Sequence, residues 1–308
     1  MKTRAVAVCI VLAALLAFST EAFSWGNATH VYINDNLDGK GSICDANEIY
    51  GGLGPDIFNF MFQDPVLLQY LTALTHGHAT EVWNAARTKR EKALAFGFVS
   101  HNEVWGADRT AHRAGITYGV TDGYVIAKAN ELLTLAPLPP ELGIPEGAAA
   151  EIYHNVVEIA VDILIKEHLD QQVGQKMASA ALARSSEFPH LLVRAYGEAI
   201  AGTTGLSNGE AVRFIRASER ELRNTTVLYG QALMQDTATA VNLLSEQMVD
   251  LAEAFLGQPL PVEREAAEAL VADLVYVAMW LSADDFAGEI TATITFVGDQ
   301  LSRRGFIY

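Results

Sequence analysis

Apolar residues recur every three or four positions along most of this 308-residue chain, a spacing that predicts α-helices rather than strands. Asp64 before Pro65 is typical of a helix start, because aspartate caps the first turn and proline fits its first position. Thr88, with Glu91 three residues later, has the pattern of a capping box. The helix that it begins is predicted to continue to His101.

The same spacing continues into the second half of the chain. Further helices are predicted from Thr80 and over 146–169, 172–183, 189–201, 208–222, 225–256, 262–282 and 286–303. The threonine-rich segment 290–297 alternates like a strand, but its flanks favour helix. Residues 137–145 are rich in proline and are predicted to form a loop. We therefore expect an all-α fold.

The first 24 residues have the pattern of a secretory signal peptide. Lys2 and Arg4 precede an apolar stretch of about 14 residues, and small residues allow cleavage either after Ala22 or directly before Trp25. An N-terminal membrane anchor is the alternative, but the stretch is short for a span. We expect a secreted or periplasmic protein. Beyond the leader only Cys44 remains, which excludes an internal disulfide and a cysteine-rich zinc site.

The formal net charge of −16 limits the choice of partners. An acidic surface repels nucleic acids and anionic membranes at long range, so no stable nucleic-acid partner is expected. A phosphodiester substrate is still compatible with this charge, because bound metal ions dominate the local field of a site.

Six of the eight histidines lie between residues 30 and 154, and several carboxylates accompany them. Asp108 and His112 are four residues apart in a predicted helix, as are His154 and Glu158, so each pair points in one direction and suits one cation. Imidazole together with carboxylate is a ligand set that zinc prefers. A set of this size predicts two or three zinc ions. The histidines that we interpret as structural or exposed are His76, His168 and His190.

Several short motifs, in a fixed order, carry a resemblance to a known family. They are Trp25-Gly26-x-x-Thr29-His30-Val31, Gly54-Pro55-Asp56, Ala95-Phe96-Gly97-Phe98-Val99-Ser100-His101 and Asp108-x-x-x-His112. Over residues 25–165 the chain resembles the zinc-dependent phospholipase C family, in the branch that includes the catalytic domain of glycosylphosphatidylinositol-specific phospholipase D. P1-type nucleases are more distant relatives of that family. The resemblance implies a multi-helix bundle with three zinc ions between its helices. We expect this domain at 25–170, and at 171–308 a helical extension that is either separate or part of the same domain.

The resemblance also implies which residues bind metal. The implied ligands are Trp25, His30, Asp56, His78, His101, Asp108, His112, His154 and Glu158. Trp25 would bind through its own amino nitrogen and carbonyl oxygen if cleavage falls directly before it, and would otherwise only pack. Asp56 would be the catalytic residue that positions the attacking water, and Asp108 would bridge two metals. His78 fits the family pattern better than His76.

One spacing departs from the family, where a histidine and an aspartate are four residues apart. Here Asp108 follows His101 by seven residues. In a continuous helix that spacing separates the two residues by about 10.5 Å, too far for one metal. We therefore predict a break or bulge between Asn102 and Ala107, where Gly106 gives the backbone freedom. Glu103 is a candidate substitute ligand.

The activity that the resemblance implies is hydrolysis of a phosphodiester by metal-activated water. A phospholipase C would release diacylglycerol and a phosphorylated headgroup, with transient contact to a membrane surface. Two alternatives are a secreted zinc nuclease or nucleotidase, which needs aromatic side chains to stack on bases, and a non-catalytic zinc protein whose site is degraded around Trp105.

Overall fold

The computed structural model describes residues 25–37, 45–59, 65–139, 144, 146–256, 259–260 and 262–308. The predicted leader, Cys44 and the cap residue Asp64 lie outside these ranges. The described residues form 14 α-helices and one short 3-10 helix, with no strand among them, which confirms the all-α prediction. None of these helices is by itself long and apolar enough to span a membrane, and α14 and α15 meet that criterion only as a pair bent by 73°.

The helices of the first half are α2 (Asn27–Leu37), α3 (Asp45–Gly51), η1 (Gly54–Phe58), α4 (Pro65–Gly77), α5 (Thr80–Ala85), α6 (Lys89–His101), α7 (Ala107–His112) and α8 (Tyr124–Leu135). Those of the second half are α9 (Glu146–His168), α10 (Val173–Ala183), α11 (Phe188–Thr204), α12 (Asn208–Leu233), α13 (Thr237–Leu256), α14 (Arg264–Ser282) and α15 (Phe286–Arg303).

Local signals explain several of these boundaries. Helix α6 begins with the predicted capping box, in which Thr88 Oγ1 accepts the Glu91 amide at 3.1 Å and Glu91 Oε2 accepts the Thr88 amide at 3.2 Å. The threonine-rich segment 290–297 is helical, as its flanks indicated, and lies inside α15.

One predicted boundary is wrong. We expected helices at 208–222 and 225–256, but α12 continues through that gap to Leu233. Thr225 and Thr226 interrupt neither the helix nor its hydrogen bonding, because their hydroxyls donate to the carbonyls of the residues four positions earlier. The break falls at Asp236 instead, whose carboxylate accepts the Thr239 amide at 3.1 Å and caps α13.

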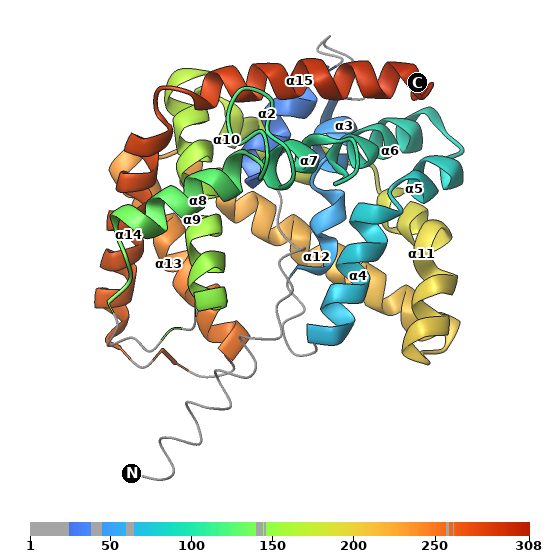
Figure 1. Ribbon diagram of the computed structural model, residues 1–308. Coiled ribbons are helices and arrows are strands. Elements are labelled where there is room, and N and C mark those ends of the chain that lie inside the picture. Colours follow the sequence, from blue (N-terminus) through green and yellow to red (C-terminus); the bar gives the residue numbers. More distant parts are fainter. Residues whose placement is uncertain are drawn as a thin grey trace.

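Figure 1 shows how the helices are arranged. Helix α15 runs across one side of the molecule over α2 and α7, and α8, α9, α13 and α14 lie together at one end. Helices α4, α5 and α11 lie at the other end, and α12 packs against α10 and α11.

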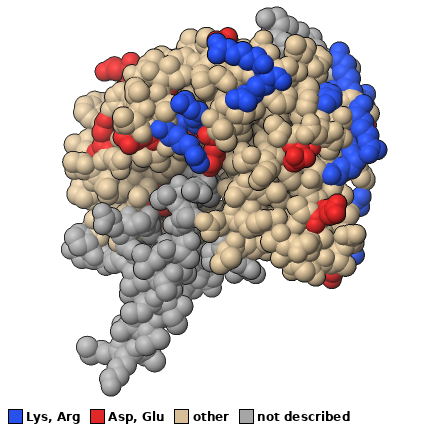
Figure 2. Space-filling view, turned by 45° about the vertical axis from the view of Figure 1, so that its right-hand side comes forward, with Lys and Arg blue, Asp and Glu red and all other residues tan. Residues whose placement is uncertain are grey.

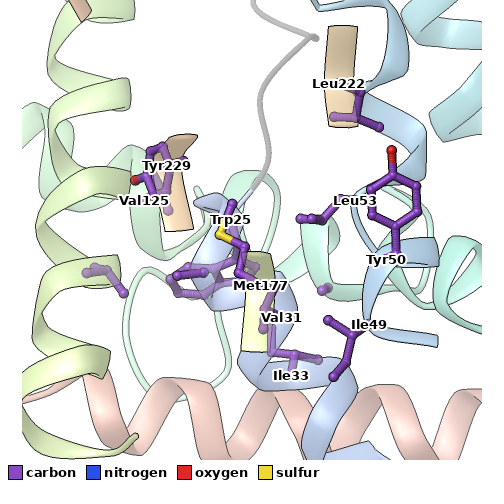
Figure 3. Packing of buried hydrophobic residues seen from close by; sticks show 14 of the residues in the cluster. Trp25, Val31, Ile33, Ile49, Tyr50, Leu53, Val125, Met177, Leu222 and Tyr229 are labelled. Carbon is purple, nitrogen blue, oxygen red and sulfur yellow. The ribbon is translucent and has the colours of Figure 1, made fainter. Parts of the chain in front are cut away.

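The two halves of the chain share one hydrophobic core. Trp25, Val31 and Tyr50 from the first half pack in the same buried cluster as Met177 and Tyr229 from the second half (Figure 3). Helices beyond residue 170 therefore pack directly against those that carry the candidate ligands.

Helices α3 and α6 cross with their backbones in contact. A Cβ atom placed on Gly97 of α6 would lie 2.0 Å from the carbonyl oxygen of Glu48, and one placed on Gly51 would lie 2.1 Å from that of Leu94. Only glycine fits at either position. This crossing fixes the position of the Gly52 carbonyl oxygen, which forms a hydrogen bond with His101 Nδ1 at the end of α6.

Charge is unevenly distributed over the surface. On the face seen in Figure 2, lysine and arginine side chains lie near the top, along the right-hand edge and left of the centre, and acidic side chains lie mainly at the left and to the right of the centre. The net charge of −16 determines the long-range repulsion of anions, but the local charge on this face is partly positive.

Candidate metal centre

The break predicted between His101 and Asp108 is present. Helix α6 ends at His101, and α7 begins at Ala107. Asn102 shapes the turn, because its Oδ1 accepts the amides of Val104 and Trp105 at 2.9 and 3.0 Å. Gly106 is required there, since a Cβ atom at this position would lie 2.5 Å from the carbonyl oxygen of Ser100. His101 Nε2 consequently lies 2.8 Å from Asp108 Oδ2, which confirms the prediction.

The first group of candidate ligands comprises His30 of α2, His101 of α6 and Asp108 of α7. The imidazoles of His30 and His101 stack with their centroids 3.9 Å apart, and His30 Nε2 lies 3.2 Å from Asp108 Oδ1. All three side chains are fully buried. The Gly52 carbonyl lies 2.7 Å from His101 Nδ1, so it orients this ring with Nε2 toward the aspartate.

The second group comprises Asp56 of η1, His76 of α4 and, again, His101. His76 Nε2 lies 3.4 Å from Asp56 Oδ1, 3.5 Å from Asp108 Oδ2 and 3.2 Å from His101 Nε2. Thr75 ties α4 to η1, because its hydroxyl donates to the Pro55 carbonyl at 2.7 Å. His101 and Asp108 thus lie where the first two groups meet.

The structure brings His76 into the second group rather than His78, which we preferred from the sequence. His76 is buried in the centre, whereas His78 is exposed beyond the last residue of α4. Residues two positions apart at the end of a helix point in nearly opposite directions, so only one of these two histidines reaches the centre. The spacing along α4 is the signal that identifies His76. Leu68 and Thr72 lie eight and four residues before His76, on the same face of the helix, and both are buried.

The third group comprises His112 of α7 with His154 and Glu158 of α9. His154 Nε2 lies 2.7 Å from Glu158 Oε1, and the rings of His112 and His154 are 4.9 Å apart. His112 Nε2 is buried without a hydrogen-bond partner among the described residues. A buried imidazole nitrogen of this kind is what a metal ion would satisfy.

Opposite charges are tightly coupled in the first two groups. Burial would lower the pKa of His101, but Asp108 and Asp56 outweigh it and raise that pKa to about 9. Burial would raise the pKa of Asp108, but the neighbouring His101 outweighs it and lowers that pKa. The pKa of Asp56 is lowered in the same way by His101 and His76. Without a metal, a proton on His101 supplies the positive charge that these carboxylates require.

The third group has the opposite electrostatics. Burial and the nearby His154 lower the pKa of His112 well below its usual value. Burial, together with Asp162, raises the pKa of Glu158 well above its usual value. His112 and Glu158 therefore favour their neutral forms until a cation compensates the glutamate.

Two other candidates pack rather than join a group. The indole of Trp25 is buried against Tyr124, and its Nε1 donates to Thr110 Oγ1 at 2.9 Å. Metal binding by its amino nitrogen stays a prediction. Glu103 joins none of the three groups, and its Oε2 accepts Arg113 Nη2 at 2.6 Å. His168 and His190 are exposed, as expected.

One buried carboxylate next to the centre was not anticipated. Asp162 lies one turn beyond Glu158 on α9 and accepts hydrogen bonds from Ala28, Thr29 and Tyr229. Its partners are more than 60 residues away in the chain, so no local sequence pattern indicates it.

Comparison of the chain with models of protein families, with curated proteins and with solved structures finds no match. A function for this protein must therefore be inferred from the three side-chain groups and from the motifs that hold them.

Proposed function

We propose that this protein is a zinc-dependent hydrolase of phosphodiesters, with a phospholipase C-like reaction. The observation that carries the proposal is the convergence of three groups of histidine and carboxylate side chains, with the ligand atoms of each group within 4.8 Å of one another. His101 belongs to two groups, and Asp108 Oδ2 lies 2.8 Å from His101 Nε2 and 3.5 Å from His76 Nε2. Clusters of two or three metals are typical of enzymes that cleave phosphodiesters.

The side chains present fit zinc. The donors are imidazoles and carboxylates, with no thiolate in any of the three groups, and this set suits zinc better than calcium or magnesium. The buried, unpartnered His112 Nε2 supports the same conclusion. Bound zinc would neutralise phosphate oxygens and lower the pKa of a bound water.

Asp56 is the best placed residue to position that water. Its side chain is 9% exposed, whereas those of His30, His101 and Asp108 are fully buried. Asn59 Nδ2 donates to Asp56 Oδ1 at 2.9 Å and fixes its orientation. Because neighbouring histidines lower its pKa, Asp56 stays ionised and accepts hydrogen bonds.

Among phosphodiesters we favour a phospholipid, on the strength of the motifs shared with phospholipases C. The enzyme would act outside the cytoplasm after removal of residues 1–24 and would contact a membrane surface transiently. The non-catalytic alternative rested on the His101–Asp108 spacing, and the 2.8 Å contact between these side chains removes that reason.

Metal analysis followed by a hydrolysis panel tests the proposal. The purified protein should retain two or three zinc ions after mild dialysis and should hydrolyse phosphatidylcholine or phosphatidylinositol, with loss of activity after chelation. Hydrolysis of single-stranded DNA alone would replace the phospholipase assignment with the nuclease one. A folded protein that binds no zinc would contradict the whole proposal.

His76 and His78 provide a paired test of the centre. His76→Ala should remove a ligand and lower hydrolysis by more than about 100-fold, since losing even an outer partner of a ligand costs roughly 10- to 100-fold. His78→Ala should leave activity within about twofold, because exposed substitutions usually change stability by less than about 0.5 kcal/mol. Initial rates and zinc content of both variants check this. Equal losses in the two variants would contradict the placement of His76.

Zinc binding should release protons near neutral pH. His101 has a pKa of about 9 in the metal-free protein, so zinc must displace its proton at pH 7.5, and affinity should rise with pH up to about 9. The same raised pKa stabilises the metal-free fold fully below pH 6.5, and this stabilisation is lost as pH rises through 9. Titration calorimetry in buffers of different ionisation enthalpy should count at least one released proton per chain. A count of zero would refute the expected protonation of His101.

A further inference from the structure

The helix that carries His30 begins without a cap of its own. Gly26 precedes α2, and its carbonyl accepts the first intrahelical hydrogen bond, from the His30 amide at 3.1 Å. Glycine has no side chain to accept the next free amides of the first turn, which ordinarily bond to a serine, threonine or aspartate at this position. Those amides belong to Ala28 and Thr29, the two residues directly before His30.

A carboxylate from another helix supplies the missing cap. Asp162 Oδ2 accepts the Ala28 amide at 2.9 Å, and Asp162 Oδ1 accepts both the amide and the hydroxyl of Thr29 at 2.7 Å. Asp162 is fully buried on α9. A Cβ atom on Gly26 would lie 2.6 Å from Asp162 Oδ1, so glycine is needed there to admit the carboxylate.

The place of Asp162 along α9 gives this contact a consequence for the metal centre. Glu158, a member of the third ligand group, lies four residues earlier on the same helix. His30, a member of the first group, follows the two capped amides on α2. A single carboxylate therefore fixes the helix that bears one group against the helix that bears another. Tyr229 of α12 braces it, donating to Asp162 Oδ2 at 2.9 Å.

We propose that Asp162 is a positioning residue of the centre, which sets the separation of the His30 group from the His154 and Glu158 group by capping α2 from α9. This inference rests on the proposed function for its metal-binding part. Asp162 belongs to none of the three ligand groups, so it acts through the backbone that precedes His30 rather than as a ligand.

The test is metal binding by Asp162→Asn, which keeps the shape of the side chain but turns one acceptor into a donor that faces N–H or O–H groups. Zinc affinity is measured by competition with a chelator, and the geometry of the site by the visible absorption of the cobalt-substituted protein. We expect a loss of affinity of roughly tenfold or more, as for other groups that orient ligands, and a changed cobalt spectrum. Wild-type affinity and an unchanged spectrum would overturn the proposal.

A control separates positioning from general loss of stability. Glu219 is another buried carboxylate, and it accepts hydrogen bonds from Arg184 and Tyr50, neither of which belongs to a ligand group. Glu219→Gln should lower thermal stability yet keep wild-type zinc affinity and cobalt spectrum. An equal loss of affinity in this variant would show that Asp162 acts only through stability. If Asp162→Asn does not fold, Tyr229→Phe removes a single bond to the same carboxylate and should give a smaller shift in the same direction.

Hydrogen exchange of the metal-free protein distinguishes failure of this inference from failure of the proposed function. The amides of Ala28 and Thr29 should exchange faster in Asp162→Asn than in the wild type, whereas amides of α12 away from Tyr229 should not. Unchanged exchange at these two amides would overturn the cap, whatever the protein binds. A wild-type chain that shows the protected amides but binds no zinc would overturn the proposed function and the metal-positioning role together, and would leave the cap as a purely structural contact.

Discussion

Replacing Asp108 with alanine is expected to remove at least one zinc ion and to lower phosphodiester hydrolysis by more than about 100-fold. Mutating a residue that only hydrogen-bonds to a metal ligand typically costs less than this. Its carboxylate lies 2.8 Å from His101 and 3.2 Å from His30, and no other carboxylate among the described residues is in the same group. Zinc content by elemental analysis and initial rates with the best substrate of the hydrolysis panel measure both effects.

The same substitution should destabilise the metal-free protein. It leaves His101 buried without its nearest negative charge, and breaking a buried ion pair typically costs about 3–5 kcal/mol. Glu103→Ala is the matched control, because Glu103 lies in the adjacent turn, pairs with Arg113 and belongs to no ligand group. That variant should keep its zinc. Full zinc content and activity in Asp108→Ala would contradict the proposed centre.

Gly97→Ala is expected to destabilise the fold severely, by more than the roughly 1–3 kcal/mol of ordinary overpacking. The new methyl group would lie 2.0 Å from the Glu48 carbonyl oxygen and 2.7 Å from the Gly52 amide nitrogen, and both are backbone atoms that cannot move aside by rotation. Helices α3 and α6 would have to separate, and the Gly52 carbonyl would move away from His101. Chemical denaturation of the metal-free protein measures the loss directly.

Gly202→Ala is the matched control for that prediction. Gly202 also lies within a helix, α11, but nothing approaches the position of its Cβ atom within 4 Å. Because alanine favours helix over glycine by up to about 1 kcal/mol, this variant should be as stable as the wild type or more stable. Equal destabilisation of the two variants would mean that the α3–α6 crossing does not require Gly97.

Helix positions and the broken ligand helix could be predicted from sequence, because both depend on nearby residues. Thr88 and Glu91 cap α6 as their spacing indicated. The break before Asp108 followed from the resemblance, which implies that His101 and Asp108 bind a shared metal, together with the distance that a continuous helix would have put between them. The gap predicted between 208–222 and 225–256 was wrong, because α12 continues to Leu233 and the hydroxyls of Thr225 and Thr226 bond within that helix.

The sequence did not show which of His76 and His78 lies in the centre. The residues after His78 fitted a family motif, whereas the structure buries His76 on the inner face of α4. Asp162 could not be predicted at all. Its role depends on which helix packs beside the first turn of α2, and this is a property of the whole fold rather than of any segment.

Helix α15 and the residues after it contact the segments that carry the candidate ligands. Thr293 donates to Thr110, which accepts the indole N–H of Trp25, so one chain of hydrogen bonds joins the last helix to the first ligand segment. Glu289 accepts the amides of Ile116, Thr117 and Tyr118, in the loop that follows α7. Phe306, three residues beyond the end of α15, stacks on Trp105 in the turn between His101 and Asp108.

Each of these contacts joins residues that are far apart in the chain, by 183 positions for Thr110 and Thr293 and by 306 − 105 = 201 positions for Trp105 and Phe306. Because closing such long loops is slow, ligands that come early in synthesis must wait for helices that are made later. A ribosome-bound chain that stops before α15 should therefore be unable to retain zinc, whereas the released chain should acquire it in a late folding step.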